Sequence, residues 1–405
     1  MGLVNLLLIF AVIIVVMLLR RPLWLAVTLA TAATILLYGL PVKEAGGAIV
    51  RGATGWDTIE LLLVFYSITY LQRMLEKRRN LSSCQTALNG LFNNRRINAS
   101  VVPFLLGCLP AASAVLICGP IVRESVGDWL GASEKAAVTS YFRHISESFL
   151  PTYATIFLAI EITGGRVTAG EFLGFMSPVV LALFLVGWAI YLRKIPKDTG
   201  MVSDRPRGYY WKLLFQSIWT ILLAIALILL FPIPVEGAVW LCILLNAFVN
   251  RFSVAELIPF FQSALDLRLM LNTWLVMIFK EVLAATGVIT ELPSFFGGLP
   301  IPAYLVFALI FFFGTVVAGS QAIIALCMPM VVAAAGDGPV LALFILMMCM
   351  NYIAMQVSPT HICLTMCSED YRISLGSLIW RTLPMVVIML FFSFAYYALL
   401  TLAGL

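Results

Sequence analysis

The chain has 405 residues, of which 62% are hydrophobic and 11% are charged, and its formal net charge is +5. So few charged residues cannot cover an apolar core of this size, which excludes a water-soluble globular protein. We therefore expect an all-α polytopic membrane protein that has the lipid bilayer as a partner and binds no nucleic acid.

Ten apolar stretches have close to the ~20 residues that a helix needs to cross a bilayer, or more where a break is expected. They are Leu3–Leu19, Pro22–Leu40, Thr58–Leu75, Ala136–Ile162, Phe172–Leu192, Leu213–Phe231, Val235–Asn250, Met270–Val288, Leu341–Met366 and Thr382–Leu402. The first has no basic residue before it and is followed by Arg20 and Arg21, which is the reverse of a signal peptide. We expect it to remain as a membrane anchor.

The distribution of basic residues predicts the orientation. With both termini outside, 20 of the 25 Lys and Arg residues fall in cytoplasmic loops, and only Lys43, Arg51 and Arg166 fall outside. The opposite orientation would reverse this bias. The positive-inside rule therefore predicts a multi-pass protein of the cytoplasmic (inner) membrane whose N-terminus and C-terminus both lie outside.

Two further apolar segments, residues 102–122 and 304–334, must each enter and leave on one side, because counting either as a crossing would invert every later loop. We predict re-entrant hairpins, with the first tip at Pro110–Ser113 and the second at Ala318–Gln321. Irregular backbone at membrane depth occurs where it is buried in protein or lines a wet cavity. The tips therefore indicate a site.

Both hairpins belong to a duplicated pattern. The matches are Gly107 with Gly314, Ser113 with Ser320, and Pro151-Thr152 with Pro359-Thr360, at offsets of 207, 207 and 208. We predict a first unit over residues 1–192, a cytoplasmic linker over 193–208 and a second unit over 209–405. Because five spans precede the second unit, the units are expected to form an inverted repeat.

Proline inside a membrane helix frees backbone carbonyls and amides, and the half-helix ends can bind ions or polar substrates. A break at the same place in each unit favours one shared site over two unrelated kinks. The substrate-binding candidates at the tips and breaks are Ala112, Ser113, Arg143, Pro151, Thr152, Gly319, Ser320, Gln321, Ser358, Pro359, Thr360 and His361.

Other polar residues inside spans are candidates for a coupling-ion site or a charge network, because such residues are costly in a membrane. They are His144, Glu147, Ser148, Lys280, Glu281 and Gln356. Arg143 and Glu147 stand four residues apart, so Arg143 either pairs with Glu147 or faces substrate. Lys280 and Glu281 point about 100° apart on a helix, and each therefore needs its own partner.

The chain has only two histidines, His144 and His361. His361 follows the second break, where it is either a proton relay or a core histidine. His361, Cys363 and Cys367 do not complete a set of zinc ligands. We therefore expect no metal site and no cofactor apart from a coupling sodium ion or proton, with sodium held at the hairpin tips and helix breaks.

Three stretches carry a resemblance to a known family. They are Leu109-Pro-Ala-Ala-Ser113, Tyr141-Phe-Arg-His144-Ile-Ser-Glu147-Ser-Phe-Leu-Pro151-Thr and Val357-Ser-Pro-Thr-His361. In them the chain resembles an uncharacterised prokaryotic family of integral membrane proteins within the ion-transporter superfamily, which includes sodium-coupled dicarboxylate, gluconate, arsenite and sodium/proton carriers.

The resemblance implies an elevator-type transporter fold and a homodimer. It implies a scaffold of the first, second and fifth spans of each unit, and a mobile part made of the hairpins with the third and fourth spans. Dicarboxylate carriers have Ser-Asn-Thr at the tips, where this chain has Ala111-Ala-Ser113 and Ala318-Gly-Ser320. The resemblance therefore does not extend to a particular substrate.

These observations predict a secondary active transporter for a small organic or inorganic anion, coupled to sodium or protons, and not an enzyme. One alternative is a cation/proton antiporter that uses Glu147 and Glu281. An intramembrane enzyme is a more distant alternative, because the sequence has no paired catalytic Asp, no metal-binding His-Glu helix and no Gly-x-Ser-x-Gly elbow. A non-transporting receptor would not require two matched hairpins.

Overall fold

The computed structural model describes residues 21–405 except 93, 109–113, 152, 198–204, 232, 234, 289–299 and 360, together with residues 5, 8, 9, 11–13, 15, 16 and 19. All regular structure in this described part of the chain is helical. The predicted all-α class is therefore confirmed.

The first half of the chain is a series of helices joined by short connections. They are α2 (Leu23–Tyr38), α3 (Val42–Thr54), α4 (Trp56–Lys77), α5 (Asn80–Leu91), α6 (Arg95–Gly107), α7 (Ala114–Val126), α8 (Ala132–His144), α9 (Ala154–Ile162) and α10 (Ala169–Ile190), with short 3-10 turns η1 (Gly127–Trp129), η2 (Ile145–Ser148) and η3 (Leu192–Lys194). The predicted spans at 22–40, 58–75 and 172–192 coincide with α2, α4 and α10. The predicted span Leu3–Leu19 is only partly described.

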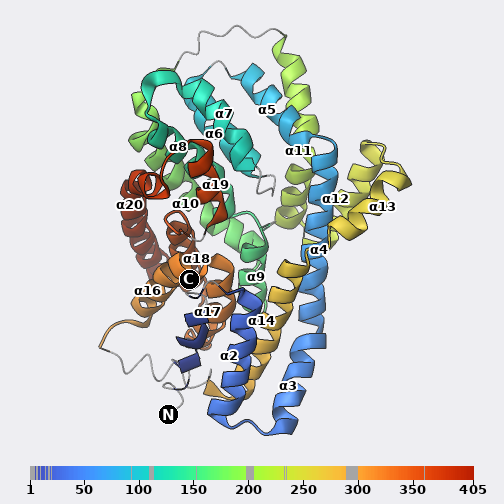
Figure 1. Cartoon of the computed structure of the whole chain (residues 1–405), viewed down its shortest axis with the longest axis vertical. Helices are drawn as coiled ribbons and strands as arrows, with labels where there is room; N and C mark the ends of the chain where they lie inside the picture. The colour runs from blue at the N-terminus through green and yellow to red at the C-terminus, as the bar shows by residue number, and fades with distance from the viewer. Residues whose placement is uncertain are drawn as a thin grey trace.

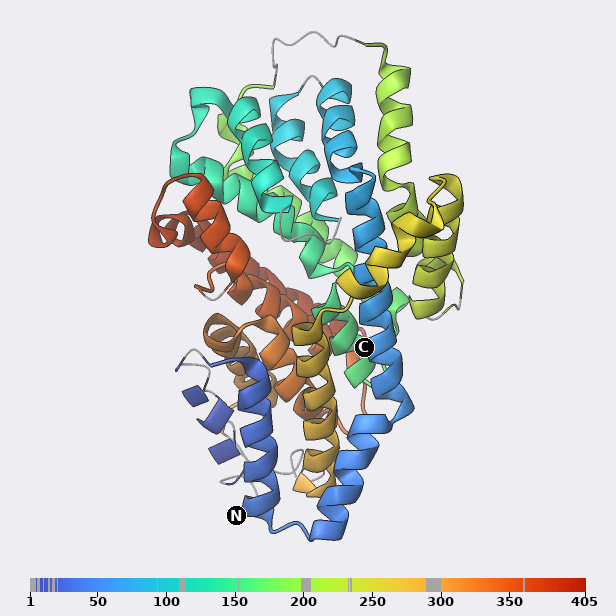
Figure 2. The same cartoon turned by 45° about the vertical axis from the view of Figure 1, so that its right-hand side comes forward.

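The second half follows the same pattern. Its helices are α11 (Arg207–Leu230), α12 (Val235–Val249), α13 (Val254–Ser263), α14 (Leu267–Ala285), α16 (Ala303–Ala318), α17 (Ser320–Ala334), α18 (Leu341–Met355), α19 (Ile362–Asp370) and α20 (Leu375–Leu402). Helices α2, α3 and α14 lie together at one end of the elongated molecule, and α5, α6 and α7 lie at the other (Figures 1 and 2).

Three of the described helices are long and apolar enough to cross a membrane. They are Ala169–Lys194, Arg207–Leu227 and Leu375–Leu402. Shorter apolar helices include α2, α16, α17 and α18. Large apolar side chains such as Leu181, Leu185 and Trp188 on α10 are exposed, as expected for a surface that faces lipid. The chain is a multi-pass membrane protein.

Helix α18 lies at the centre of the second half. Nearly all of its side chains are buried, because the helix is apolar around its whole circumference. Helices α16 and α20 pack against it. Its C-terminal end therefore carries Tyr352 into the interior, and Gln356 follows immediately after the helix.

The connection between α2 and α4 is a helix, α3, although the sequence analysis treated Lys43 and Arg51 as loop residues. The face of α3 that carries Ala45, Ala48 and Gly52 is buried. A Cβ atom at Gly52 would lie 2.5 Å from the Cα atom of Ile278, so α3 and α14 approach almost backbone to backbone. This contact stabilises a segment whose charged and glycine-rich sequence is typical of a loop.

Paired helices occupy both positions of the predicted hairpins. Helix α6 packs against α7, and α16 packs against α17. Gly319 is the one residue between α16 and α17, and it has φ +87° and ψ 160°, a conformation that is essentially restricted to glycine. The first tip, at Pro110–Ser113, lies outside the described residues. Re-entry into the membrane remains a prediction.

Both predicted breaks are present. Helix α8 ends at His144, and α9 begins at Ala154 after the turn η2. Helix α18 ends at Met355, and α19 begins at Ile362. Each proline thus lies in a helix interruption between two helical segments of one apolar stretch.

Helices at matching positions of the two predicted units pack in matching pairs. The pairs are α6 with α8 and α16 with α18, α7 with α19 and α17 with α9, α4 with α12 and α14 with α2, and α4 with α13 and α14 with α3. Several of these pairs consist of one helix from each half of the chain. The halves therefore interlock and do not form separate bundles.

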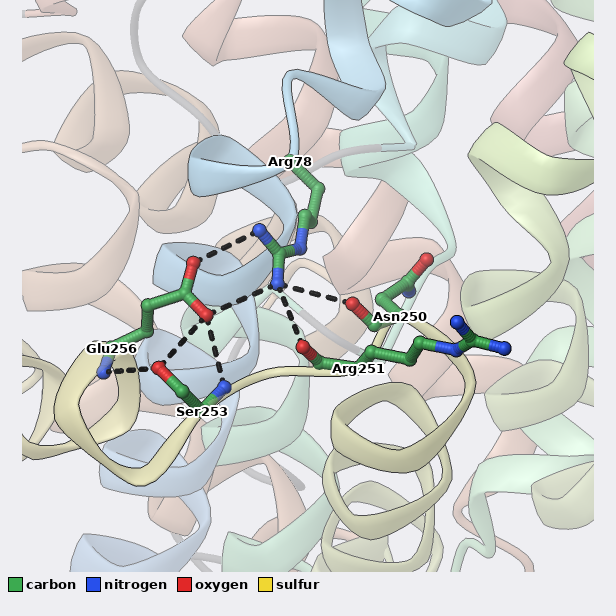
Figure 3. A network of polar contacts seen from close by, with 5 residues as sticks. All are labelled: Arg78, Asn250, Arg251, Ser253 and Glu256. Carbon is green, nitrogen blue, oxygen red and sulfur yellow. Dashed lines mark hydrogen bonds and ion pairs between the residues drawn. The ribbon is translucent and has the colours of Figure 1, made fainter.

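One polar network joins the end of α4 to the connection between α12 and α13 (Figure 3). Arg78 donates to the carboxylate of Glu256 at 3.0 Å and to the carbonyl oxygen of Asn250 at 3.0 Å. Its guanidinium also lies 3.9 Å from the ring centre of Phe252. Hydrogen bonds from the backbone amide of Ser253, and then the Arg78 guanidinium, hold the pKa of Glu256 below its usual value.

Candidate functional site

The first break is built around an ion pair. Arg143 in the last turn of α8 donates to the carboxylate of Glu147 in η2, as the spacing of four residues predicted. The Arg143 side chain is 2% exposed and that of Glu147 is 12% exposed. In a buried ion pair of this kind each charge is neutralised by its partner, because water does not reach it to solvate it.

Helix α6 of the first hairpin lies directly against this break. The hydroxyl of Tyr153 donates to the carbonyl oxygen of Gly107. A Cβ atom at Gly107 would collide with the carbonyl oxygen of Arg143 and with Oγ of Ser146. The absence of a side chain at Gly107 is therefore what lets the hairpin reach the break.

The second break contacts the second hairpin in a similar way. Oγ of Ser358 donates to the carbonyl oxygen of Val316 at 2.9 Å, and the Ser358 side chain is almost fully buried. Thr315 donates to Oδ1 of Asn351 on α18 at 2.8 Å. The Ser358 bond joins the second break to the second hairpin, and the Thr315 bond joins the same hairpin to α18. The matched glycine, Gly314, instead accommodates the Ile323 side chain within its own hairpin.

The two histidines meet between the breaks. Nε2 of His144 lies 3.0 Å from Nε2 of His361, and their ring centres are 4.9 Å apart. His144 belongs to α8 and His361 precedes α19, so this contact joins the first break to the second. No local pattern predicted that these two residues, 217 positions apart, are in contact.

Buried polar atoms without a hydrogen-bond partner lie at the C-terminal end of α18. Both amide atoms of Gln356 and the hydroxyl of Tyr352 are buried and, within the described structure, form no hydrogen bond. Tyr352 is close enough to interact electrostatically with Glu147 and Arg143. Buried polar groups normally have partners, so these atoms mark a place for water, an ion or a polar ligand. Tyr352 was missed by the sequence analysis, although it precedes Gln356 by one helical turn.

A cavity of about 490 Å³ opens at the tip of the second hairpin. It is lined by Arg21, Pro22 and Leu23 at the start of α2, by Asp266, Arg268, Leu269 and Asn272 at the start of α14, and by Ala318, Gly319, Ser320, Gln321 and Ala322. Ser320 and Gln321 form the first turn of α17, whose free backbone amides give that end a partial positive charge. Oγ of Ser320 and Oδ1 of Asn272 are buried without a hydrogen-bond partner in the described structure.

The family described as "Protein of unknown function (DUF401)" matches residues 2–400. The chain belongs to this family. The search of curated proteins found no match to this chain. Among solved structures, the YdaH transporter of Alcanivorax borkumensis, described as having an unusual topology, is similar with a TM-score of 0.63 and 14% identity over 87% of each chain. At this identity the likeness shows a shared fold. The fold of this DUF401 member is thus similar to that of the YdaH transporter.

The remaining candidates are distributed as follows. Ala112, Ser113, Thr152 and Thr360 lie outside the described residues. Pro151 is buried, whereas Pro359 is exposed. Ser148 donates its hydroxyl to the carbonyl oxygen of Ile145 at 2.7 Å.

Glu281 finds the separate partner that its position on α14 required. Its carboxylate lies 3.6 Å from Nε of Arg51 on α3, and both side chains are partly exposed. The neighbouring Lys280 is partly buried. The Glu281–Arg51 pair therefore belongs to the contact between α3 and α14, and no described contact brings it to the helix breaks.

Proposed function

We propose that this protein is a secondary active transporter that carries a small organic or inorganic anion across the cytoplasmic membrane. The observation that carries the proposal is the cavity at the second hairpin tip. Its volume lies within the range of about 300 to 1,000 Å³ that is typical of small-molecule sites. The shared fold with a protein described as a transporter supports the same conclusion.

The charge of the cavity favours an anion. Among the described residues, its lining includes two arginines, Arg21 and Arg268, and one aspartate, Asp266. That carboxylate already accepts a hydrogen bond from the amide of Leu269 as the N-cap of α14. The start of α17 adds a partial positive charge and free amides, which suit a bound anion. Arg143 adds no net positive charge for a substrate, since Glu147 balances it.

The contacts between hairpins and breaks support an elevator mechanism. Gly107 and Tyr153 hold the first hairpin to the first break, and Ser358 holds the second break to the second hairpin. The contact of His144 with His361 joins the two breaks. These elements form one packed group that can move as a unit against the remaining helices. The equivalent helix pairs of the two halves support the proposed inverted repeat, and the resemblance noted above favours a homodimer.

Coupling to sodium or protons is proposed at the unpartnered polar atoms of Gln356 and Tyr352. Oxygen atoms of amide and hydroxyl groups are suitable ligands for a hard cation. Glu147 and Glu281 each already pair with an arginine, so neither carboxylate is free to carry a cation. The arrangement therefore favours anion transport over cation/proton antiport.

The central test is a thermal-shift screen of purified protein against small organic and inorganic anions, with and without sodium, because a ligand stabilises the state that binds it. An anion that fits should raise the unfolding temperature of the wild type. It should do so much less in Arg268→Gln. Arg205→Gln, which removes the same charge at an exposed site outside the cavity, serves as the control. Equal shifts in the two variants, or no shift with any anion, would contradict the proposed site.

Transport itself is tested with a hit from that screen. In proteoliposomes, Ser113→Phe and Ser320→Phe should both abolish uptake while leaving a folded protein, because a site between two hairpin tips tolerates added bulk at neither. A folded and fully active variant at either position would contradict a two-hairpin site.

The proposed orientation has its own test. Gly46 and Gly208 are exposed, and nothing lies within 4 Å of a Cβ atom added at either position. In intact cells, Gly46→Cys should react with an impermeant thiol reagent and Gly208→Cys should not. The opposite labelling pattern would reverse the orientation.

A further inference from the structure

A cluster of three metal-ligating side chains lies between the two breaks. Nitrogen atoms of His144 and His361 and Sγ of Cys363 all lie within 4.8 Å of one another. His144 is fully buried, Cys363 is 5% exposed, and His361 is partly exposed. The cluster thus has a buried base and one ligand that reaches the surface of the packed core.

Hydrogen bonding prepares His144 as a ligand. Its Nδ1 lies 2.5 Å from the carbonyl oxygen of Ser140, which can only accept, so Nδ1 carries the proton. Nε2 is then left with a lone pair, and this lone pair is directed toward His361. Fixing of one ring nitrogen by a backbone carbonyl is the usual second-shell arrangement of a metal-bound histidine.

The distances are close to those of a metal site. A tetrahedral zinc ion with bonds of about 2.0 Å to nitrogen and 2.3 Å to sulfur separates its ligand atoms by about 3.3 to 3.6 Å. The two Nε2 atoms are 3.0 Å apart, and Sγ of Cys363 is within 4.8 Å of both histidines. Small rotations of the side chains of His361 and Cys363 would bring all three atoms to bonding distance of one ion.

The ligand types select the class of metal. Two imidazoles and a thiolate suit zinc and other thiophilic transition metals, whereas magnesium, calcium and sodium prefer oxygen. Glu147 is close enough to interact electrostatically with both imidazoles, so the surroundings are not purely cationic despite Arg143. A hydrogen bond between the histidines explains one pair of atoms but leaves Cys363 without a role.

We propose that His144, His361 and Cys363 bind one thiophilic transition-metal ion, best matched by Zn(II), that joins the two helix breaks. From the sequence we expected no metal, because His361, Cys363 and Cys367 do not complete a set of zinc ligands. The structure places His144, from the other half of the chain, beside His361. The proposal does not depend on the transport function. It rests on the positions of three side chains, one from the first break and two that follow the second.

The test is equilibrium metal binding by purified, chelator-treated protein. Wild type should bind one Zn(II) per chain. Cys363→Ser should bind at least about tenfold more weakly, since the loss of even second-shell partners costs about 10- to 100-fold in affinity. Cys367→Ser is the matched control, because Cys367 is a buried cysteine one turn further along α19 whose Sγ donates to the carbonyl oxygen of Ala136. Its binding should equal that of the wild type.

Cobalt gives a second readout, and its result for the wild type does not depend on the folding of any variant. Co(II) added to folded wild type should produce a thiolate-to-cobalt charge-transfer band, and this band should persist in Cys367→Ser and vanish in Cys363→Ser. Absence of the band in folded wild type would overturn the proposal. So would Zn(II) binding of equal strength in Cys363→Ser and in the wild type.

Discussion

Gly107→Ala is the substitution that most directly tests how the first hairpin meets its break. The new methyl group would collide with the carbonyl oxygen of Arg143 and with Oγ of Ser146. Replacing a glycine by alanine in a helix normally stabilises by up to about 1 kcal/mol. Overpacking costs about 1 to 3 kcal/mol, and the upper end applies here because one obstacle is backbone. We expect a net destabilisation of about 2 kcal/mol.

The assay is unfolding in detergent micelles followed by the loss of helical circular dichroism. Gly174→Ala is the matched control, because Gly174 also lies in a helix and nothing is within 4 Å of a Cβ atom there. The control should be as stable as the wild type or slightly more stable. If Gly107→Ala is as stable as Gly174→Ala, the close contact between hairpin and break is refuted.

Three further predictions use the same unfolding assay. Gly319→Ala should cost about 1 to 3 kcal/mol, because the backbone at this turn is essentially restricted to glycine; a variant of wild-type stability would exclude this turn. Glu147→Met should cost about 3 to 5 kcal/mol by leaving Arg143 buried without its carboxylate, and adding Arg143→Met should recover much of the loss; additive losses would show that the two charges act independently. The lowered pKa of Glu256 predicts that its stabilising contribution is present above its unfolded pKa of about 4.3 and is lost as the pH falls through the folded value, so Glu256→Gln and wild type should converge in acid; a constant difference at all pH values would contradict this.

The sequence predicted the features that local patterns control. Apolar length located most of the helices, because a backbone in lipid must form its hydrogen bonds within the helix itself. Pro151 and Pro359 located the two interruptions because they recur at the same place in the duplicated pattern, and proline in a helix interior removes a backbone hydrogen bond. The spacing of Arg143 and Glu147 predicted their ion pair, since residues four apart share a helix face.

The helix α3 shows where local patterns fail. Its glycines and charges lower the helix propensity of the segment, and its stability comes from the close fit of Gly52 against Ile278 on α14. A contact of this kind depends on which face each helix turns toward the other. Neither composition nor periodicity of one segment contains that information.

The sequence by itself thus determined the helical class, the helix breaks and the short-range ion pair. Only the tertiary structure decided that His144 meets His361, that Glu281 pairs with Arg51, and that Arg21 and Arg268 share a cavity with the second hairpin tip. The physical reason is that the two sets of features depend on different parts of the chain. Backbone hydrogen bonding and apolar length depend on one segment alone. These contacts depend on how helices from distant parts of the chain are rotated and shifted relative to one another when they pack closely.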